Sequence, residues 1–208
     1  MNHSQKSKQL KFGPIKTSTI EIQDIGKAWI ALSFAFALLY SGTYLLGGRS
    51  FLNIFSVQFA VVFLISLLTA GLGFLLHELA HKFVAQHYGC MAEFRAFDQM
   101  IYLAVGLAAV IGWIFAAPGA VMISGTVTRK ENGIISLAGP ATNFVLAGIF
   151  WVIAQSAPLF TVGIFINAWL GLFNLLPFGN FDGKKILAWS KFWWTAAIVV
   201  GVLILFGL

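Results

Sequence analysis

Long apolar runs constrain the fold of this sequence more than any other feature. Residues 51–87 are apolar over a greater length than one bilayer crossing requires, since about 20 helical residues span the hydrocarbon core. Of the 208 residues, 59% are hydrophobic and 10% are charged, whereas soluble domains have about 25% charged residues. The chain therefore cannot cover a folded surface with ionic groups, and so apolar a composition also excludes disorder. We expect lipid to surround much of the protein.

The distribution of these runs predicts an all-α polytopic membrane protein with about six membrane segments. The expected segments are residues 28–46, 51–87, 101–123, 133–157, 161–176 and 186–208. Residues 1–27 are polar and are expected to form a cytosolic N-terminal arm, in which residues 17–22 could form a short strand. Residues 28–208 would form the membrane domain.

Positive charges favour one orientation in the membrane. The chain has 13 Lys and Arg against 7 Asp and Glu, and five lysines precede the first apolar run. If residues 101–123 re-enter rather than cross, 12 of the 13 basic residues share a side with the N-terminus. We therefore expect a cytosolic N-terminus in the cell membrane and a re-entrant or strand-like segment near 92–127. The charges do not form a basic face interleaved with aromatic residues, so no nucleic-acid partner is expected.

The sequence HELAH at residues 77–81 points to metal chemistry. On a helix, His77 and His81 lie about 40° apart on one face and could hold one zinc ion. Glu78 follows the first histidine, which is the place of a general base that acts on a water molecule at the metal. Ionisable groups in lipid are costly and usually mark a functional site.

A third zinc ligand is not settled by the residues alone. The acidic and histidine candidates after the motif are His87, Glu93, Asp98, Glu131 and Asp182. On an unbroken helix His87 points about 240° away from His81. Val84 stands where the longer HExxHxxGxxH pattern has a glycine, so nothing turns the chain back. Asp182 lies in a break at 177–183, where an interrupted helix could direct it inward or an Asp-Gly turn could simply meet the interface.

Two more motifs follow in the chain, Ala-Gly-Pro-Ala-Thr-Asn at 138–143 and Asn-Leu-Leu-Pro-Phe-Gly-Asn-Phe-Asp-Gly at 174–183. With HELAH and these motifs in this order, residues 74–187 resemble the site-2 protease family of intramembrane zinc metalloproteases. One departure is Asn180, near the place of a second proline that the family often has. We expect a minimal form without a PDZ-like or C-terminal regulatory module.

The resemblance implies the roles of particular residues. The implied ligands of a single Zn²⁺ are His77, His81 and Asp182. Glu78 would be the catalytic acid/base, and Asn143 and Asn174 would position the substrate backbone or stabilise the oxyanion. Residues 28–208 would then be an intramembrane metalloprotease domain that cleaves transmembrane segments of other proteins near the cytosolic side. No organic cofactor is expected.

Two alternatives lead to different chemistry. In another class of membrane zinc protease the third ligand is a glutamate, but Glu93 and Glu131 both lie outside the expected membrane helices. A non-proteolytic metal-binding or transport protein would require the second and third motifs to be accidental. If the protein is a protease, a strand edge near 92–99 or 119–127 could hold an unwound substrate by β-addition.

Overall fold

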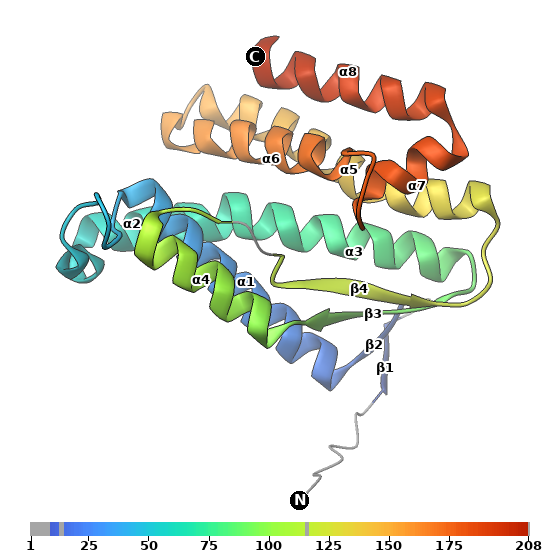
Figure 1. Ribbon diagram of the computed structural model, residues 1–208, viewed down its shortest axis with the longest axis horizontal. Helices are drawn as coiled ribbons and strands as arrows, with labels where there is room; N and C mark the ends of the chain where they lie inside the picture. The colour runs from blue at the N-terminus through green and yellow to red at the C-terminus, as the bar shows by residue number, and fades with distance from the viewer. Residues whose placement is uncertain (1–8, 13–14, 115–116, 208) are drawn as a thin grey trace, which may run out of the picture.

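The computed structural model describes residues 9–12, 15–114 and 117–207, and it is mostly helical (Figure 1). Its α-helices are α1 (Thr19–Ser41), α2 (Val57–Ser66), α3 (Leu72–His87), α4 (Asp98–Ile111), α5 (Arg129–Ala154), α6 (Thr161–Asn174), α7 (Asp182–Trp189) and α8 (Lys191–Gly207). Four strands form two antiparallel pairs: β1 (Gln9–Phe12) with β2 (Ile15–Ser18), and β3 (Met91–Ala96) with β4 (Gly119–Ser124). Short helical turns lie at η1 (Phe51–Phe55), η2 (Leu67–Gly71) and η3 (Pro158–Phe160).

The first helix begins earlier than expected. The strand predicted for residues 17–22 ends at Ser18, and α1 starts at Thr19, so that prediction is wrong from Thr19 onward. The reason is local: Ser18 Oγ accepts the backbone N–H of Glu21 at 3.2 Å, as in the S-x-x-E pattern that starts helices. Residues 19–27 of the expected polar arm are therefore part of the first long helix, while residues 1–8 and 13–14 lie outside the described residues.

Within the described residues, three helices are long and apolar enough to cross a membrane, judged by length and composition. They are Thr19–Ser41, Val57–His87 and Arg129–Ala154. The second joins α2 and α3 through the π-helical turn η2 into a run of 31 residues. Other predicted segments form shorter apolar helices at Asp98–Ile111, Pro158–Asn174 and Lys191–Gly207. The helices suggest a membrane protein, but the expected count of six spans is not confirmed.

The two ends of the segment between residues 91 and 124 pair with each other in one antiparallel sheet. Met91 pairs with Ser124 and Ala96 pairs with Gly119, so the two ends of the excursion through α4 are neighbours. Helix α4 ends at Ile111 and is followed by Gly112, whose left-handed backbone (φ 66°) turns the chain. Residues 101–123 thus form a helix and a returning strand instead of one long helix, in agreement with the strand-like segment predicted near 92–127.

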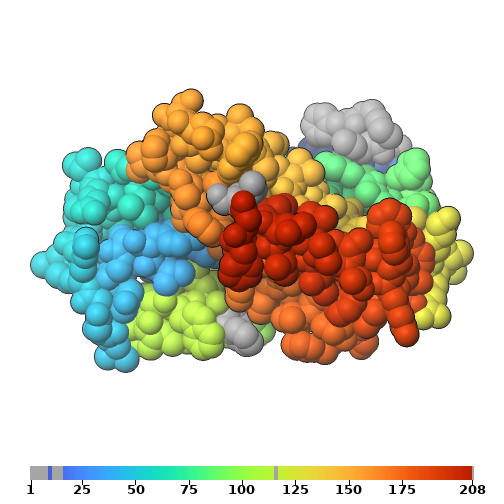
Figure 2. All heavy atoms as spheres, turned by 90° about the horizontal axis from the view of Figure 1, so that it is seen from above, coloured from blue at the N-terminus to red at the C-terminus, as the bar shows by residue number. Residues whose placement is uncertain are grey.

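Helix α3 occupies the middle of the molecule. In Figure 1 the β3–β4 sheet and α1 lie on one side of α3, and α5 to α8 lie on the other side. Figure 2 shows α8 lying across one outer face. Most of its exposed side chains are apolar, including Phe192, Val199, Leu203 and Phe206. His77, His81 and Lys82 of α3 are enclosed by protein, and the outer face of α8 is suited to lipid.

Candidate metal centre

The two histidines of HELAH lie on successive turns of α3, and both are buried. Their rings are 4.7 Å apart between centroids, and His77 and His81 are 4% and 7% exposed. Nδ1 of His81 lies 2.7 Å from the carbonyl oxygen of Ile135 in α5. Because a carbonyl oxygen can only accept, this Nδ1 bears a proton and donates it. Nε2 is therefore the atom of His81 that a metal ion can use.

A different partner orients His77 in the same way. Its Nδ1 lies 2.5 Å from Oδ1 of Asn143 in α5. The Nδ2 amide of Asn143 donates to the Gly73 carbonyl and to Oδ1 of Asn167, each at 3.1 Å. Oδ1 of Asn143 is thus left to accept the Nδ1 proton of His77. Such outer contacts fix the ring orientation of metal-binding histidines and direct Nε2 toward the metal.

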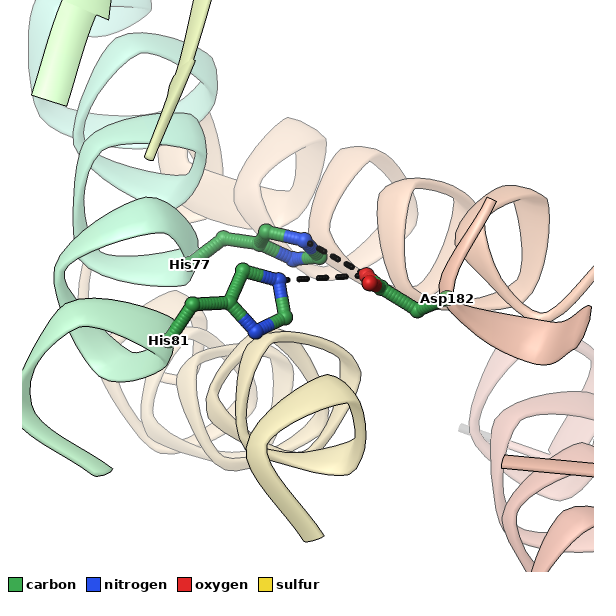
Figure 3. Close-up of side chains that lie close together, drawn as sticks. All are labelled: His77, His81 and Asp182. Carbon is green, nitrogen blue, oxygen red and sulfur yellow. Dashed lines mark ion pairs between the residues drawn. The ribbon is translucent and has the colours of Figure 1, made fainter. Parts of the chain in front are cut away.

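Asp182 is the first residue of α7, and its side chain points toward both Nε2 atoms (Figure 3). Its Oδ2 lies 3.3 Å from Nε2 of His77 and 3.1 Å from Nε2 of His81. Burial raises the pKa of the Asp182 carboxyl, but the His81 and His77 imidazoles outweigh burial and hold this pKa below its usual range. A carboxylate that binds a metal ion must be ionised. Oδ2 of Asp182 can form ion pairs with the two imidazoles when they are protonated. Alternatively, this oxygen and the two Nε2 atoms can together bind one metal ion.

The close approach of Asp182 depends on the glycine that follows it. A Cβ atom at Gly183 would overlap the backbone carbonyl of Leu175, at the end of α6. Without a side chain, the start of α7 packs directly against this carbonyl, which places Asp182 against α3. The Asp-Gly sequence therefore has a packing reason as well as a chemical one.

The donor set fits a catalytic zinc ion. His77, His81 and Asp182 each offer one ligand atom, and these atoms lie within 4.8 Å of one another. Two imidazole nitrogens and one carboxylate oxygen are typical of catalytic zinc, which keeps a further position for water or substrate. Gly139 borders the same space: a Cβ there would overlap Nε2 of His81 and lie 2.5 Å from Nε2 of His77. Only a glycine at this position of α5 leaves the ligand atoms accessible.

Glu78 is held by the sheet next to α3. Its Oε2 accepts the backbone N–H of Val121 in β4 at 2.9 Å, and its side chain is half-buried. The hydrogen bond fixes the direction of a carboxylate that neighbours the His77 ligand in sequence. β4 therefore lies beside the residue expected to act as the base.

The predicted asparagines lie in different surroundings. Asn143 is fully buried and its amide is engaged by His77, Gly73 and Asn167, so the structure makes it an orienting partner of a histidine. Asn174 ends α6, where its Nδ2 donates to the carbonyl of Leu170 at 2.9 Å. A role of Asn143 or Asn174 in binding substrate stays a prediction.

The other ligand candidates have separate partners or positions. Glu93 is paired with Arg95, and Glu131 accepts the N–H and hydroxyl of Thr128 as a helix cap. His87 is exposed at the end of α3. Asp98 is paired with Lys27. In the part of the chain that the structure describes, none of these four belongs to a group of metal-ligating side chains.

Sequence reasoning did not identify the supporting contacts of Asn167 and Ile135. A signal was present for Asn167, since it is a polar residue within an apolar segment, and such residues commonly hydrogen-bond to a neighbouring helix. The carbonyl of Ile135 has no sequence signal, because every residue has a backbone carbonyl.

Replacing Gly139 tests the geometry of the centre. We expect Gly139→Ala to lower zinc affinity about 10–100-fold, the range seen when the surroundings of a metal site are disturbed. The added methyl would occupy the space in front of both Nε2 atoms. Gly148→Ala is the matched control, because a Cβ at this position of α5 meets nothing within 4 Å. Zinc competition with a chromophoric chelator measures both variants, and equal affinities would contradict the geometry.

Replacing Asn143 tests the orientation of His77. Asn143→Leu removes the acceptor at similar volume, so we expect zinc affinity to fall about 10–100-fold. Asn143→Asp retains an acceptor and should restore part of the loss. The same competition titration is used, on protein that elutes as a single species. Wild-type affinity in Asn143→Leu would show that this contact does not prepare the ligand.

Comparison with known proteins finds relatives that are named as zinc metalloproteases. "Putative zinc metalloprotease MJ0611" of Methanocaldococcus jannaschii is 45% identical over 142 residues, which cover 64% of this chain and 74% of the relative. "Zinc metalloprotease MJ0392" of the same organism is 28% identical over 140 residues, or 64% of this chain and 34% of the relative. "Putative zinc metalloprotease Rip3" of Mycobacterium tuberculosis is 31% identical over 139 residues, which cover 62% of this chain and 29% of the relative.

The chain spans about a third of the length of the last two relatives and most of the first. No family model matches the chain, and no solved structure matches it. The relatives share a zinc metalloprotease name, and the structure brings together a donor set that suits zinc. The chain belongs to the site-2 protease family of zinc metalloproteases.

Proposed function

We propose that this protein is a zinc-dependent intramembrane endopeptidase that hydrolyses a peptide bond within transmembrane segments of other proteins. The observation behind this proposal is the buried group of His77, His81 and Asp182, with Glu78 next to it on α3. The three ligand atoms come from α3 and α7, which are far apart in sequence, and they converge inside a protein that exposes many large apolar side chains. One zinc ion would suffice for the reaction.

The chain's own residues account for the proton transfers. When bound, a zinc ion supplies Lewis acidity, which makes water a stronger acid and polarises the scissile carbonyl. Glu78 takes a proton from the attacking water while the water oxygen bonds to the carbonyl carbon. The peptide C–N bond then breaks, and Glu78 returns the proton to the leaving nitrogen. His77, His81 and Asp182 keep the reacting groups in place.

Substrate geometry gives β4 a function. The carbonyls of a transmembrane helix are engaged by its own i→i−4 hydrogen bonds, so the helix must unwind before attack. An extended peptide needs new partners for its backbone, and a strand edge provides them. In the described part of the chain no third strand pairs with the outer edge of β4. Because Val121 of β4 contacts Glu78, a peptide added to this edge would lie beside the base.

The location follows from the apolar helices together with the charge pattern. We infer an integral protein of the cell membrane with a cytosolic N-terminus and an active site toward the cytosolic side. A transmembrane protein would be the substrate. A non-proteolytic metal-binding or transport protein is not favoured, because it does not account for relatives named as proteases.

The decisive test separates zinc binding from cleavage. In vesicles with a purified helical substrate, the wild-type protein should cleave and a zinc chelator should stop it. Glu78→Gln should retain zinc and lose cleavage at least about 100-fold, since general acid–base catalysis contributes about 10²–10⁴-fold. Asp182→Ala should lose zinc and activity together.

Glu93→Gln is the control for removing a carboxylate elsewhere, because Glu93 is paired with Arg95 on β3. It should leave the rate unchanged. Near-wild-type cleavage by Glu78→Gln, or full zinc retention by Asp182→Ala, would contradict the assigned roles. Zinc-loaded wild-type protein that cleaves no helical substrate would contradict the proposed function.

A further inference from the structure

A second buried carboxylate lies outside the metal centre. Glu21 near the start of α1 has 0% exposure and accepts three hydrogen bonds. Its Oε2 accepts from Lys82 Nζ at 2.6 Å and from the hydroxyl of Thr17 at 2.6 Å, and its Oε1 accepts the N–H of Phe94 at 2.8 Å. Lys82 is 2% exposed. A charge pair buried this deeply is costly unless its hydrogen bonds are satisfied, as they are here.

These contacts join the sheet to the helix of the metal centre. Lys82 follows the ligand His81 on α3, and Phe94 lies on β3. Across the sheet, Phe94 is the register partner of Val121. The N–H of Val121 is the group bound by Glu78. The facing residues Phe94 and Val121 are thus each bound by a carboxylate. Val121 is bound by Glu78 of α3, and Phe94 is bound by Glu21, which pairs with Lys82 of α3.

The direction of the two N–H groups shows how they fix the sheet. Both are bound by carboxylates outside the sheet, so neither is directed toward the partner strand. Phe94 and Val121 therefore form a non-hydrogen-bonded pair of the antiparallel ladder. Outward N–H groups recur only every second residue, about 6.8 Å along a strand. A one-residue displacement of the sheet would leave both carboxylates without these donors.

We propose that Glu21 is a positioning residue that, through Lys82 and Phe94, sets where β4 lies along α3 and so selects the peptide bond that is cleaved. The inference rests on the proposed function. A substrate bound to the outer edge of β4 takes its register from β4, whereas His77 and His81 are fixed on α3. The place of the sheet along α3 therefore decides which peptide bond reaches the metal centre.

The double variant Glu21→Gln/Lys82→Met tests this proposal. It removes both buried charges at similar volume and leaves β3 an acceptor at residue 21, but it breaks the connection to α3. We expect unchanged zinc content, a several-fold higher KM, and cleavage that spreads to peptide bonds on either side of the wild-type bond. Mass spectrometry of the products identifies the peptide bond that is cleaved. A loss of stability alone would lower the rate but would not change which bond is cleaved. Cleavage at the wild-type bond only would overturn the proposal.

Asp98→Asn is the matched control. Asp98 pairs with Lys27 and so joins α1 to α4, away from the facing pair Phe94 and Val121. This variant should cleave at the wild-type bond; a spread equal to that of the double variant would overturn the assignment to Glu21. If the double variant yields no folded protein, Glu21→Asp replaces it. It keeps the charge but withdraws the carboxylate from Phe94, and the same outcomes apply.

A measurement that does not depend on proteolytic activity separates this inference from the proposed function. Hydrogen exchange of residues 91–96 and 119–124 should be faster in the double variant than in wild type and in Asp98→Asn. Unchanged exchange would overturn the inference. Faster exchange together with a wild-type protein that cleaves nothing would contradict only the proposed function. A wild-type protein with one cleavage site that the double variant retains would contradict only the positioning role.

Discussion

The convergence of two imidazole Nε2 atoms on the carboxylate of Asp182 is the interaction on which the rest of the structure depends. Polar atoms buried in an apolar protein must be partnered, and here the partners are arranged so that one pair of nitrogens remains for a metal ion. The Ile135 carbonyl and Asn143 engage the Nδ1 atoms. Helix α5 therefore orients both ligands of α3 without providing one itself.

Close backbone packing makes this arrangement possible. Gly139 brings α5 against the imidazoles, and Gly183 brings the start of α7 against the end of α6. On the opposite side of α3, the β3–β4 sheet is bound through Glu78 and Glu21. Helix α3 is thus contacted by the ligand-orienting helix on one side and by the proposed substrate edge on the other. The metal centre and the strand edge share one helix, so under the proposed function the place of the strand along α3 would set the substrate register.

The sequence predicted those parts of the site that depend on local spacing. The i, i+4 separation places His77 and His81 on one helix face, and the resemblance to a family, not spacing, assigned Asp182. The structure brings all three together. Residues 17–22 were expected to form a strand, but Ser18 and Glu21 also fit the S-x-x-E pattern that starts helices, and the helix begins at Thr19. Contacts such as Lys82 with Glu21 join residues distant in sequence, so no local pattern could predict them. Nor could spacing show that Asn143 would contact His77.

Zinc K-edge X-ray absorption on the purified wild-type protein identifies the atoms that bind the metal. If His77, His81 and Asp182 hold zinc, its nearest shell contains nitrogen and oxygen only, at about 2.0–2.2 Å, with the outer scattering of two imidazoles. A sulfur neighbour at about 2.3 Å, which would implicate Cys90, the single cysteine of the chain, would contradict this ligand set. A zinc shell without imidazole scattering would contradict it equally.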